Sequence, residues 1–136
     1  MLTKIQDIIC ETQGDIFRCA SQWKLDMDIF VPKYMDSQFC LRNMDGIYSY
    51  FQMADGEECL DYILKEIDVP TLSKEKYQPQ IMEWVGFTYR QLAFVLAKKS
   101  SEILDKLPLT AMLMYYPGLH TVDEEMAIDI ICEDTF

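Results

Sequence analysis

Only a few side chains in this sequence combine residue types that could support covalent catalysis. A cysteine thiolate beside a histidine can act as a nucleophile with a neighbouring base, and the chain contains one histidine, His120, and five cysteines. Cys132 follows His120 by twelve residues, a spacing that does not force contact. We therefore expect no catalytic pair, and we interpret His120 as a capping or packing residue or as part of a partner-binding surface.

The cysteines do not form the pattern of a metal site or a disulfide framework. Their number is odd and no two are spaced C-x-x-C, whereas zinc sites use paired ligands at short spacing and disulfide-rich secreted domains use even sets. We expect five reduced, mostly buried thiols: Cys10, Cys19, Cys40, Cys59 and Cys132.

The carboxylates are numerous, but none forms a specific catalytic or metal-binding motif. Glu57 with Asp61 and Glu125 with Asp129 are spaced i, i+4 and could share a metal, yet no histidine lies nearby to complete a site of the di-iron type. The sequence also has no G-x-G-x-x-G, P-loop or G-x-S-x-G motif. It therefore predicts a protein that is not an enzyme and that has no metal or cofactor.

The charge is strongly negative and unevenly distributed. Twelve basic against 23 acidic residues give a net charge of −11, which disfavours nucleic acid because Lys and Arg carry that affinity. Residues 108–136 contain six acidic residues and no Lys or Arg. Acids in the first turns of helices explain part of this excess. The remainder indicates an acidic face that steers onto a basic protein partner.

An alternative hypothesis is a DNA-binding helix-turn-helix in residues 85–107. A helix ending at Lys98 and Lys99, a turn, and a second helix capped by Ser100 and Ser101 would suit that geometry. However, Glu102 and Asp105 would face the phosphates, where a recognition helix normally offers basic or amide side chains. The basic residues that support this alternative are Arg90, Lys98, Lys99 and Lys106.

The elements in the first half of the chain follow from apolar spacing and capping residues. Thr3 and Gln6 form a capping box for a helix over 4–22, which Gly14 should weaken. A second helix starts after Asp26 or Asp28, with Pro32 in its first turn.

Residues 47–53 are aromatic and lack a partner strand, so we expect an ordered loop. The caps and apolar stripes then predict helices over 56–67, after Asp55, and 79–98, from Pro79.

The second half continues the helical pattern. A short helix begins at Ser100-Ser101 and ends at Pro108, and another covers 109–116 until Pro117-Gly118 breaks it. Thr121 and Glu124 form a second capping box for a last helix over 122–133. The polar segment 70–78 is too short to separate two domains. We therefore predict one all-α domain over 1–136, a compact bundle of six or seven helices with at most one short β segment.

The sequence also bears on location. No stretch reaches 18 apolar residues, so we expect no membrane span. Asp7 lies where a signal peptide would be apolar. We therefore expect a cytoplasmic protein.

Part of the chain resembles a known family. The segments Lys99–Leu104, Tyr116–Thr121 and Ala127–Ile130 follow a pattern of a Ser-rich cap before Glu-Ile, then Tyr-x-x-Leu-His-Thr, then an acidic helix containing Ala-Ile. The pattern covers about the last 50 residues. It resembles an uncharacterised family of small helical proteins of Firmicutes, similar to antitoxins encoded beside ADP-ribosyltransferase-like toxins. The resemblance implies a protein partner, such as a toxin, and places Tyr116, His120 and Thr121 either at a structural corner or on a partner surface.

Together these observations predict a non-catalytic, antitoxin-like or immunity-like interaction module that binds a protein through an acidic helical surface. The alternatives are a DNA-binding regulator, an enzyme or metal protein, and a protein with a structural role, and the chain could form a homo-oligomer. The predicted partner-binding residues are Tyr116, His120, Asp123, Glu124 and Glu125.

Overall fold

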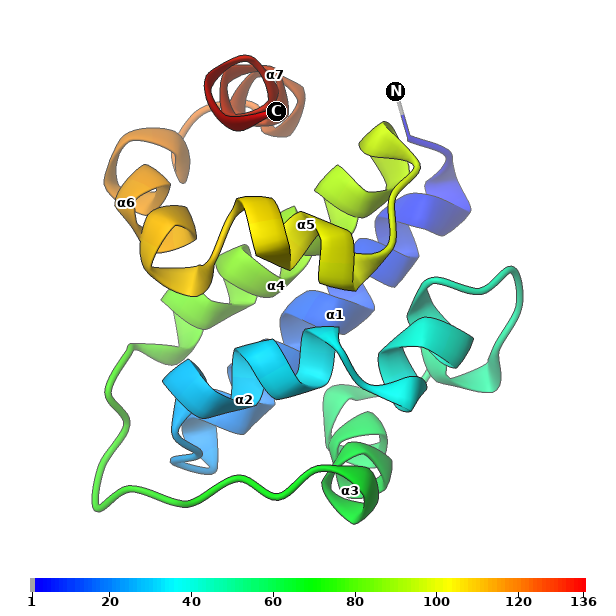
Figure 1. The fold of residues 1–136 in the computed structure, drawn as a ribbon, viewed down its shortest axis with the longest axis vertical. Helices are drawn as coiled ribbons and strands as arrows, with labels where there is room; N and C mark the ends of the chain where they lie inside the picture. The colour runs from blue at the N-terminus through cyan, green and yellow to red at the C-terminus, as the bar shows by residue number, and fades with distance from the viewer. Residues whose placement is uncertain (1) are drawn as a thin grey trace.

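Helices account for nearly all the regular structure in residues 2–136, the part of the chain that the computed structural model describes. The prediction of an all-α bundle of six or seven helices is confirmed. The elements, shown in Figure 1, are α1 (Lys4–Gln22), α2 (Met27–Met35), a π-helical turn η1 (Cys40–Met44), a 3-10 turn η2 (Tyr50–Gln52), α3 (Gly56–Glu66), α4 (Pro79–Leu96), α5 (Ser100–Lys106), α6 (Leu109–Leu119) and α7 (Glu124–Thr135).

The two longest helices, α1 and α4, form the centre of the bundle and pack against each other more extensively than any other pair. They cross at two glycines. A Cβ on Gly86 would lie 2.7 Å from the Gln13 carbonyl oxygen, and one on Gly14 would lie 2.9 Å from that of Glu83. Gly14 therefore does more than weaken α1, because it allows the two helix backbones to approach closely.

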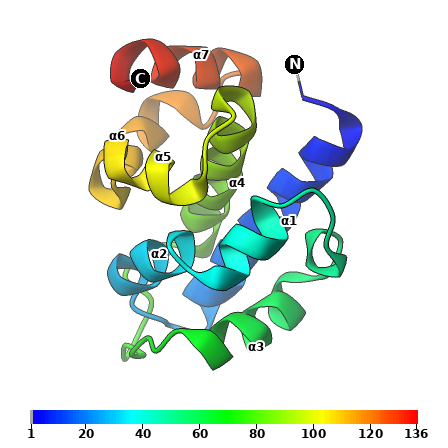
Figure 2. The same ribbon diagram turned by 45° about the vertical axis from the view of Figure 1, so that its right-hand side comes forward.

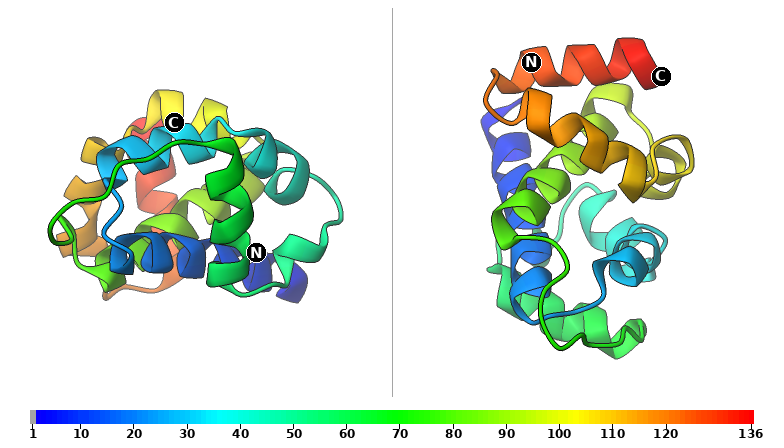
Figure 3. Two further views of the ribbon diagram at one scale, coloured as in Figure 1. Left: turned by 90° about the horizontal axis from the view of Figure 1, so that it is seen from below. Right: turned by 90° about the vertical axis from the view of Figure 1, so that its left-hand side faces the viewer.

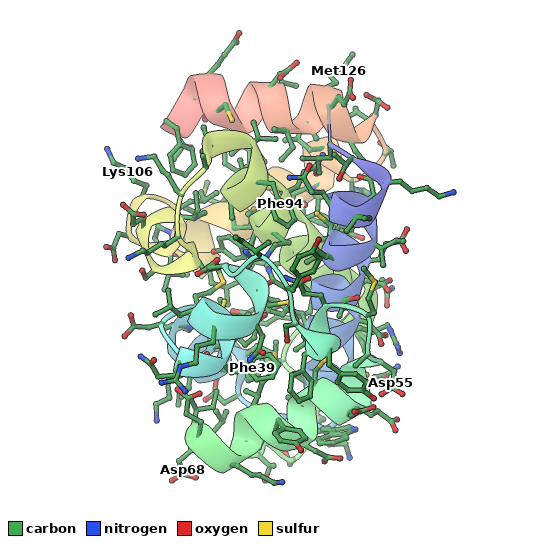
Figure 4. All side chains as sticks on the ribbon, turned by 90° about the vertical axis from the view of Figure 1, so that its right-hand side faces the viewer. Phe39, Asp55, Asp68, Phe94, Lys106 and Met126 are labelled. Atoms are coloured by element: carbon green, nitrogen blue, oxygen red, sulfur yellow. The ribbon has the colours of Figure 1, made fainter. Side chains whose placement is uncertain are left out.

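The remaining helices surround this pair. α7 lies across one end of the bundle and α3 across the opposite end (Figure 3). Figure 4 marks the ends with Met126 on α7 and with Asp55 and Asp68 on either side of α3. The start of α1 lies close to α7, so these two helices meet at one end of the molecule (Figure 2).

Several predicted helix ends are confirmed by their hydrogen bonds. The Thr3 hydroxyl accepts from the Gln6 amide at 3.1 Å, and the Gln6 side chain accepts from the Thr3 amide at 3.0 Å. Asp55 caps α3 by accepting from the Glu58 amide at 2.8 Å. α4 begins at Pro79 as expected and ends two residues earlier than expected, at Leu96.

Two prolines are placed differently from the prediction. α2 starts directly after Asp26, one of its two predicted caps, so Pro32 lies inside the helix, beyond the first turn. α6 continues through Pro117 to Leu119, although an interior proline removes one backbone hydrogen bond and crowds the preceding turn.

The caps of two further helices also differ from the prediction. Asp123, and not Thr121, caps α7, and its carboxylate accepts from the amides of Glu125 and Met126. The α5 cap is Lys99, whose amide donates to Glu102 at 2.9 Å. Ser100 is therefore not the cap, and its hydroxyl instead accepts a hydrogen bond from Arg90 and donates one to Asp45.

The segments expected to be irregular contain little regular structure. Residues 47–53 include only the 3-10 turn η2, and 70–78 contribute an isolated antiparallel bridge between Leu25 and Thr71. Across 2–136, none of the helices combines the length and the apolar character needed to cross a membrane.

Candidate functional site

A groove of about 340 Å³ separates one face of α4 from the corner between α6 and α7. Trp84, Phe87, Thr88 and Gln91 line its α4 side, at positions i, i+3, i+4 and i+7 that fall on one face of a helix. The opposite side is formed by residues around the α6–α7 corner: Leu119, His120, Val122, Glu124 and Ala127.

Three aromatic side chains fix this corner. The His120 ring stacks on Tyr116, with centroids 4.2 Å apart and an interplanar angle of 13°, and Tyr116 packs edge-on against Trp84 at 5.5 Å. His120 Nδ1 lies 2.7 Å from the Tyr116 carbonyl oxygen. A carbonyl only accepts, so Nδ1 carries the hydrogen, and in the neutral ring Nε2 is the free acceptor.

Acidic residues surround the groove at the start of α7. Glu124 is exposed at the groove, while Asp123 caps the helix beside it. Partial burial and then the carboxylates of Asp7, Asp123 and Glu11 raise the pKa of Glu124. In the described part of the chain, none of these four acidic side chains has a cationic partner within ion-pair distance. We call Asp7, Glu11, Asp123, Glu124 and Glu125 the acidic surface.

The structure brings together most of the predicted site residues. Tyr116, His120 and Glu124 meet at the groove, and Asp123 lies next to them. Glu125 lines a neighbouring hollow of about 260 Å³, which it shares with Leu2, Val95, Ile128, Asp129 and Gln91, the last of which also lines the groove. The identity of these residues as a binding site stays a prediction.

The sequence analysis did not predict that residues of α4 belong to the site. Trp84, Thr88 and Gln91 lie on the flank of a helix whose apolar surface is unusually wide, which indicates a central helix. The sequence signal that could have identified this side is the pair Thr88 and Gln91, because they are polar side chains within an otherwise apolar flank. Both are buried in the structure.

Arg90, a basic residue that the DNA-binding alternative relies on, lies in the core. Its side chain is 1% exposed and pairs with Asp45 at 2.8 Å. It also donates to the Gln13 side chain, the Met44 carbonyl oxygen and the Ser100 hydroxyl, the last at 2.6 Å. Arg90 therefore connects α1, η1, α4 and α5, and its guanidinium cannot reach a phosphate backbone.

Among residues 2–136, no hydrogen bond joins a cysteine to His120. All five are free thiols and four are buried, as expected. Burial raises the pKa of Cys10 and of Cys59 to about 12, and burial followed by Asp129 raises the pKa of Cys132. Within residues 2–136, no group of three or more His, Cys, Asp or Glu side chains is placed to hold a metal ion.

Neither a protein-family model, nor a curated protein, nor a solved structure matches this chain.

Proposed function

We propose that this protein is a non-catalytic interaction module of the antitoxin or immunity type, which binds a basic protein partner through the acidic surface and the adjoining groove. The observation that carries the proposal is the set of carboxylates around Glu124. Partial burial, and then the neighbouring carboxylates, raise the pKa of Glu124, and no basic side chain of residues 2–136 lies within ion-pair distance of these carboxylates.

Placing like charges together costs free energy that the isolated protein does not recover. A basic partner surface would supply the missing counter-charge and would also accelerate association by electrostatic steering. The groove beside these carboxylates adds shape and apolar contact. The groove combines aromatic and charged side chains, as protein-binding sites commonly do.

The mechanism we propose is steric occlusion. The partner is first attracted by charge, and α7 with the α6–α7 corner then covers a functional surface of that partner. This mechanism requires no chemistry from the protein itself, in agreement with the buried, high-pKa thiols and with a histidine whose Nδ1 is engaged by a backbone carbonyl.

The DNA-binding alternative has less support than the sequence alone suggests. Of its four basic residues, Lys98, Lys99 and Lys106 are exposed, whereas Arg90 is enclosed by the core. No feature of the described structure favours this alternative over the protein partner.

Affinity capture from a lysate of the organism that encodes the protein tests the proposal. The wild type is compared with D123N/E124Q/E125Q, in which the asparagine introduced at position 123 retains the ability to cap α7. The matched control is D61N/E75Q/D105N, which removes the same charge at three exposed acids whose side chains have no hydrogen-bonded partners in the described structure.

We expect one stoichiometric basic protein on the wild type and on the control, and its loss from D123N/E124Q/E125Q. Equal retention of that protein by both triple variants would contradict the proposal, because binding would then not depend on this surface.

A further inference from the structure

We propose that the groove between α4 and the α6–α7 corner is a receptor for a single arginine side chain. This inference rests on the proposed function, because the arginine would belong to the basic partner. It goes further by naming the group that is recognised and the residues that recognise it.

The first observation concerns two buried polar side chains, Thr88 and Gln91. They are 3% and 5% exposed, and neither side chain has a hydrogen-bond partner among residues 2–136. No partnerless side-chain nitrogen or oxygen of the described residues is sealed off from solvent. The polar atoms of Thr88 and Gln91 therefore reach open space: Thr88 lines the groove, and Gln91 lines both the groove and the neighbouring hollow beside Glu125.

Side chains as buried as these normally have a hydrogen-bond partner within the protein, so the accessible polar atoms of Thr88 and Gln91 are open to a ligand. The hydroxyl of Thr88 and the amide oxygen of Gln91 are acceptors, and the free Nε2 of His120 is a third. A ligand that supplies several N–H donors would therefore satisfy this groove.

The second observation concerns charge. Glu124 lines one side of the groove and Glu83 the other. Glu83 has only a long ion pair, 3.7 Å from Arg18, and is half exposed. Two carboxylates on opposite sides of a groove select a cation, and the raised pKa of Glu124 agrees with a site that lacks one.

The third observation distinguishes arginine from lysine. Trp84 and Phe87 give the groove aromatic walls, on which a planar guanidinium stacks more favourably than a strongly hydrated ammonium. Five N–H donors also match a groove with several separate acceptors. The volume of about 340 Å³ is near the lower limit for small-ligand pockets, about 300 Å³, and suits one long side chain.

Titration with Nα-acetyl-L-arginine amide, followed by two-dimensional 1H–15N NMR, tests the proposal. The chain has two tryptophans, so its spectrum contains two indole signals: Trp84 in the groove, and Trp23 after the end of α1 as an internal reference. The spectrum of the variant W23F lacks the Trp23 indole signal and so identifies which of the two signals belongs to Trp84. We expect a saturable shift of the Trp84 signal at millimolar concentration with Trp23 unmoved.

Two comparisons give the test its specificity. Nα-acetyl-L-lysine amide, at the same ionic strength, should bind about fivefold more weakly. E124Q should weaken arginine binding by about fivefold or more, whereas E133Q, on an exposed residue of the same helix, should not. Q91L should remove most of the preference for arginine over lysine while circular dichroism remains that of the wild type.

The outcomes separate this proposal from the proposed function. A Trp84 signal that does not move, or that moves equally with the lysine probe, overturns the arginine site even if partner capture depends on the acidic surface. A specific Trp84 shift without a partner in the capture experiment supports the site and contradicts the proposed function.

Discussion

At Glu124, the binding role that we propose would come at a cost in stability. The N-terminus of α7 favours a negative charge at this position, but partial burial and the nearby carboxylates raise the pKa of Glu124. The folded state thus binds its proton more tightly than the unfolded state does. The unfolding free energy therefore falls as the pH rises from the ordinary glutamate range through this raised pKa.

We predict that E124Q raises the Tm at pH 7 by about 1–2 °C while it weakens partner binding. The gain should disappear near pH 4, where the carboxyl is largely protonated in both states. Thermal unfolding followed by circular dichroism from pH 4 to pH 8 measures it. A Tm that falls at pH 7 would show that the helix dipole outweighs the neighbouring carboxylates.

The thiols should be unreactive in the folded protein. A pKa of about 12 at Cys10 and Cys59 leaves little thiolate at pH 8. Cys132 is the least buried, so we predict that it labels first with Ellman's reagent and that the other four react at least about a hundredfold more slowly than free cysteine. C132S should remove the fast phase. A thiol that reacts faster than free cysteine would contradict the non-catalytic interpretation.

At the scale of the elements, the α1–α4 crossing depends on the absence of a side chain. A Cβ at position 86 would meet the Gln13 carbonyl oxygen and Phe17 Cγ, each at 2.7 Å, and a helix backbone cannot yield as a flexible side chain can. We predict that G86A lowers the unfolding free energy by about 2–3 kcal/mol in urea titration.

The matched substitution is G118A in α6, where a Cβ would meet no atom within 4 Å. Alanine is the better helix former, so we expect it to add about 0.5 kcal/mol. Similar effects at both positions would mean that intrinsic helix propensity, rather than close packing, explains the glycines.

Element boundaries were predictable where a local signal acts alone. The Thr3 capping box, the Asp55 cap and the proline at the start of α4 involve only neighbouring residues, and all three are confirmed. At the start of α7, both Thr121 and Asp123 are residue types that cap helices well, and the sequence alone does not show which of them is the cap. In the structure α6 continues past Pro117 to Leu119 with His120 as its C-cap, so Thr121 lies in the turn and Asp123 caps α7.

At the scale of the whole molecule, Arg90 holds four elements together. It is a buried cation paired with Asp45 and hydrogen-bonded to α1, η1 and α5. Replacing Arg90 by an uncharged residue would leave the buried carboxylate of Asp45 without a counter-charge.

We predict that R90M lowers the unfolding free energy by about 3–5 kcal/mol, measured by urea titration. R42M, at an exposed arginine of the same bundle, should stay within about 0.5 kcal/mol of the wild type. A mild effect of R90M would indicate that the network is replaceable by apolar packing.

The fold class followed from helical periodicity, which local spacing encodes. The groove could not be predicted from local spacing, because it forms between residues of α4 and residues of the α6–α7 corner that are about 35 positions apart in the sequence. The sequence did place Tyr116, His120 and the acids of α7 on one segment. It could not show that Thr88 and Gln91 are buried opposite them without hydrogen-bond partners among the described residues.

The most direct test of the acidic surface is the association rate constant with the captured partner at low and moderate salt. We predict that at about 50 mM salt D123N/E124Q/E125Q associates about tenfold more slowly than D61N/E75Q/D105N, and that the difference shrinks as salt screens the charges. Equal rate constants and equal Kd values for the two variants would contradict recognition through the surface formed by α7 and α1.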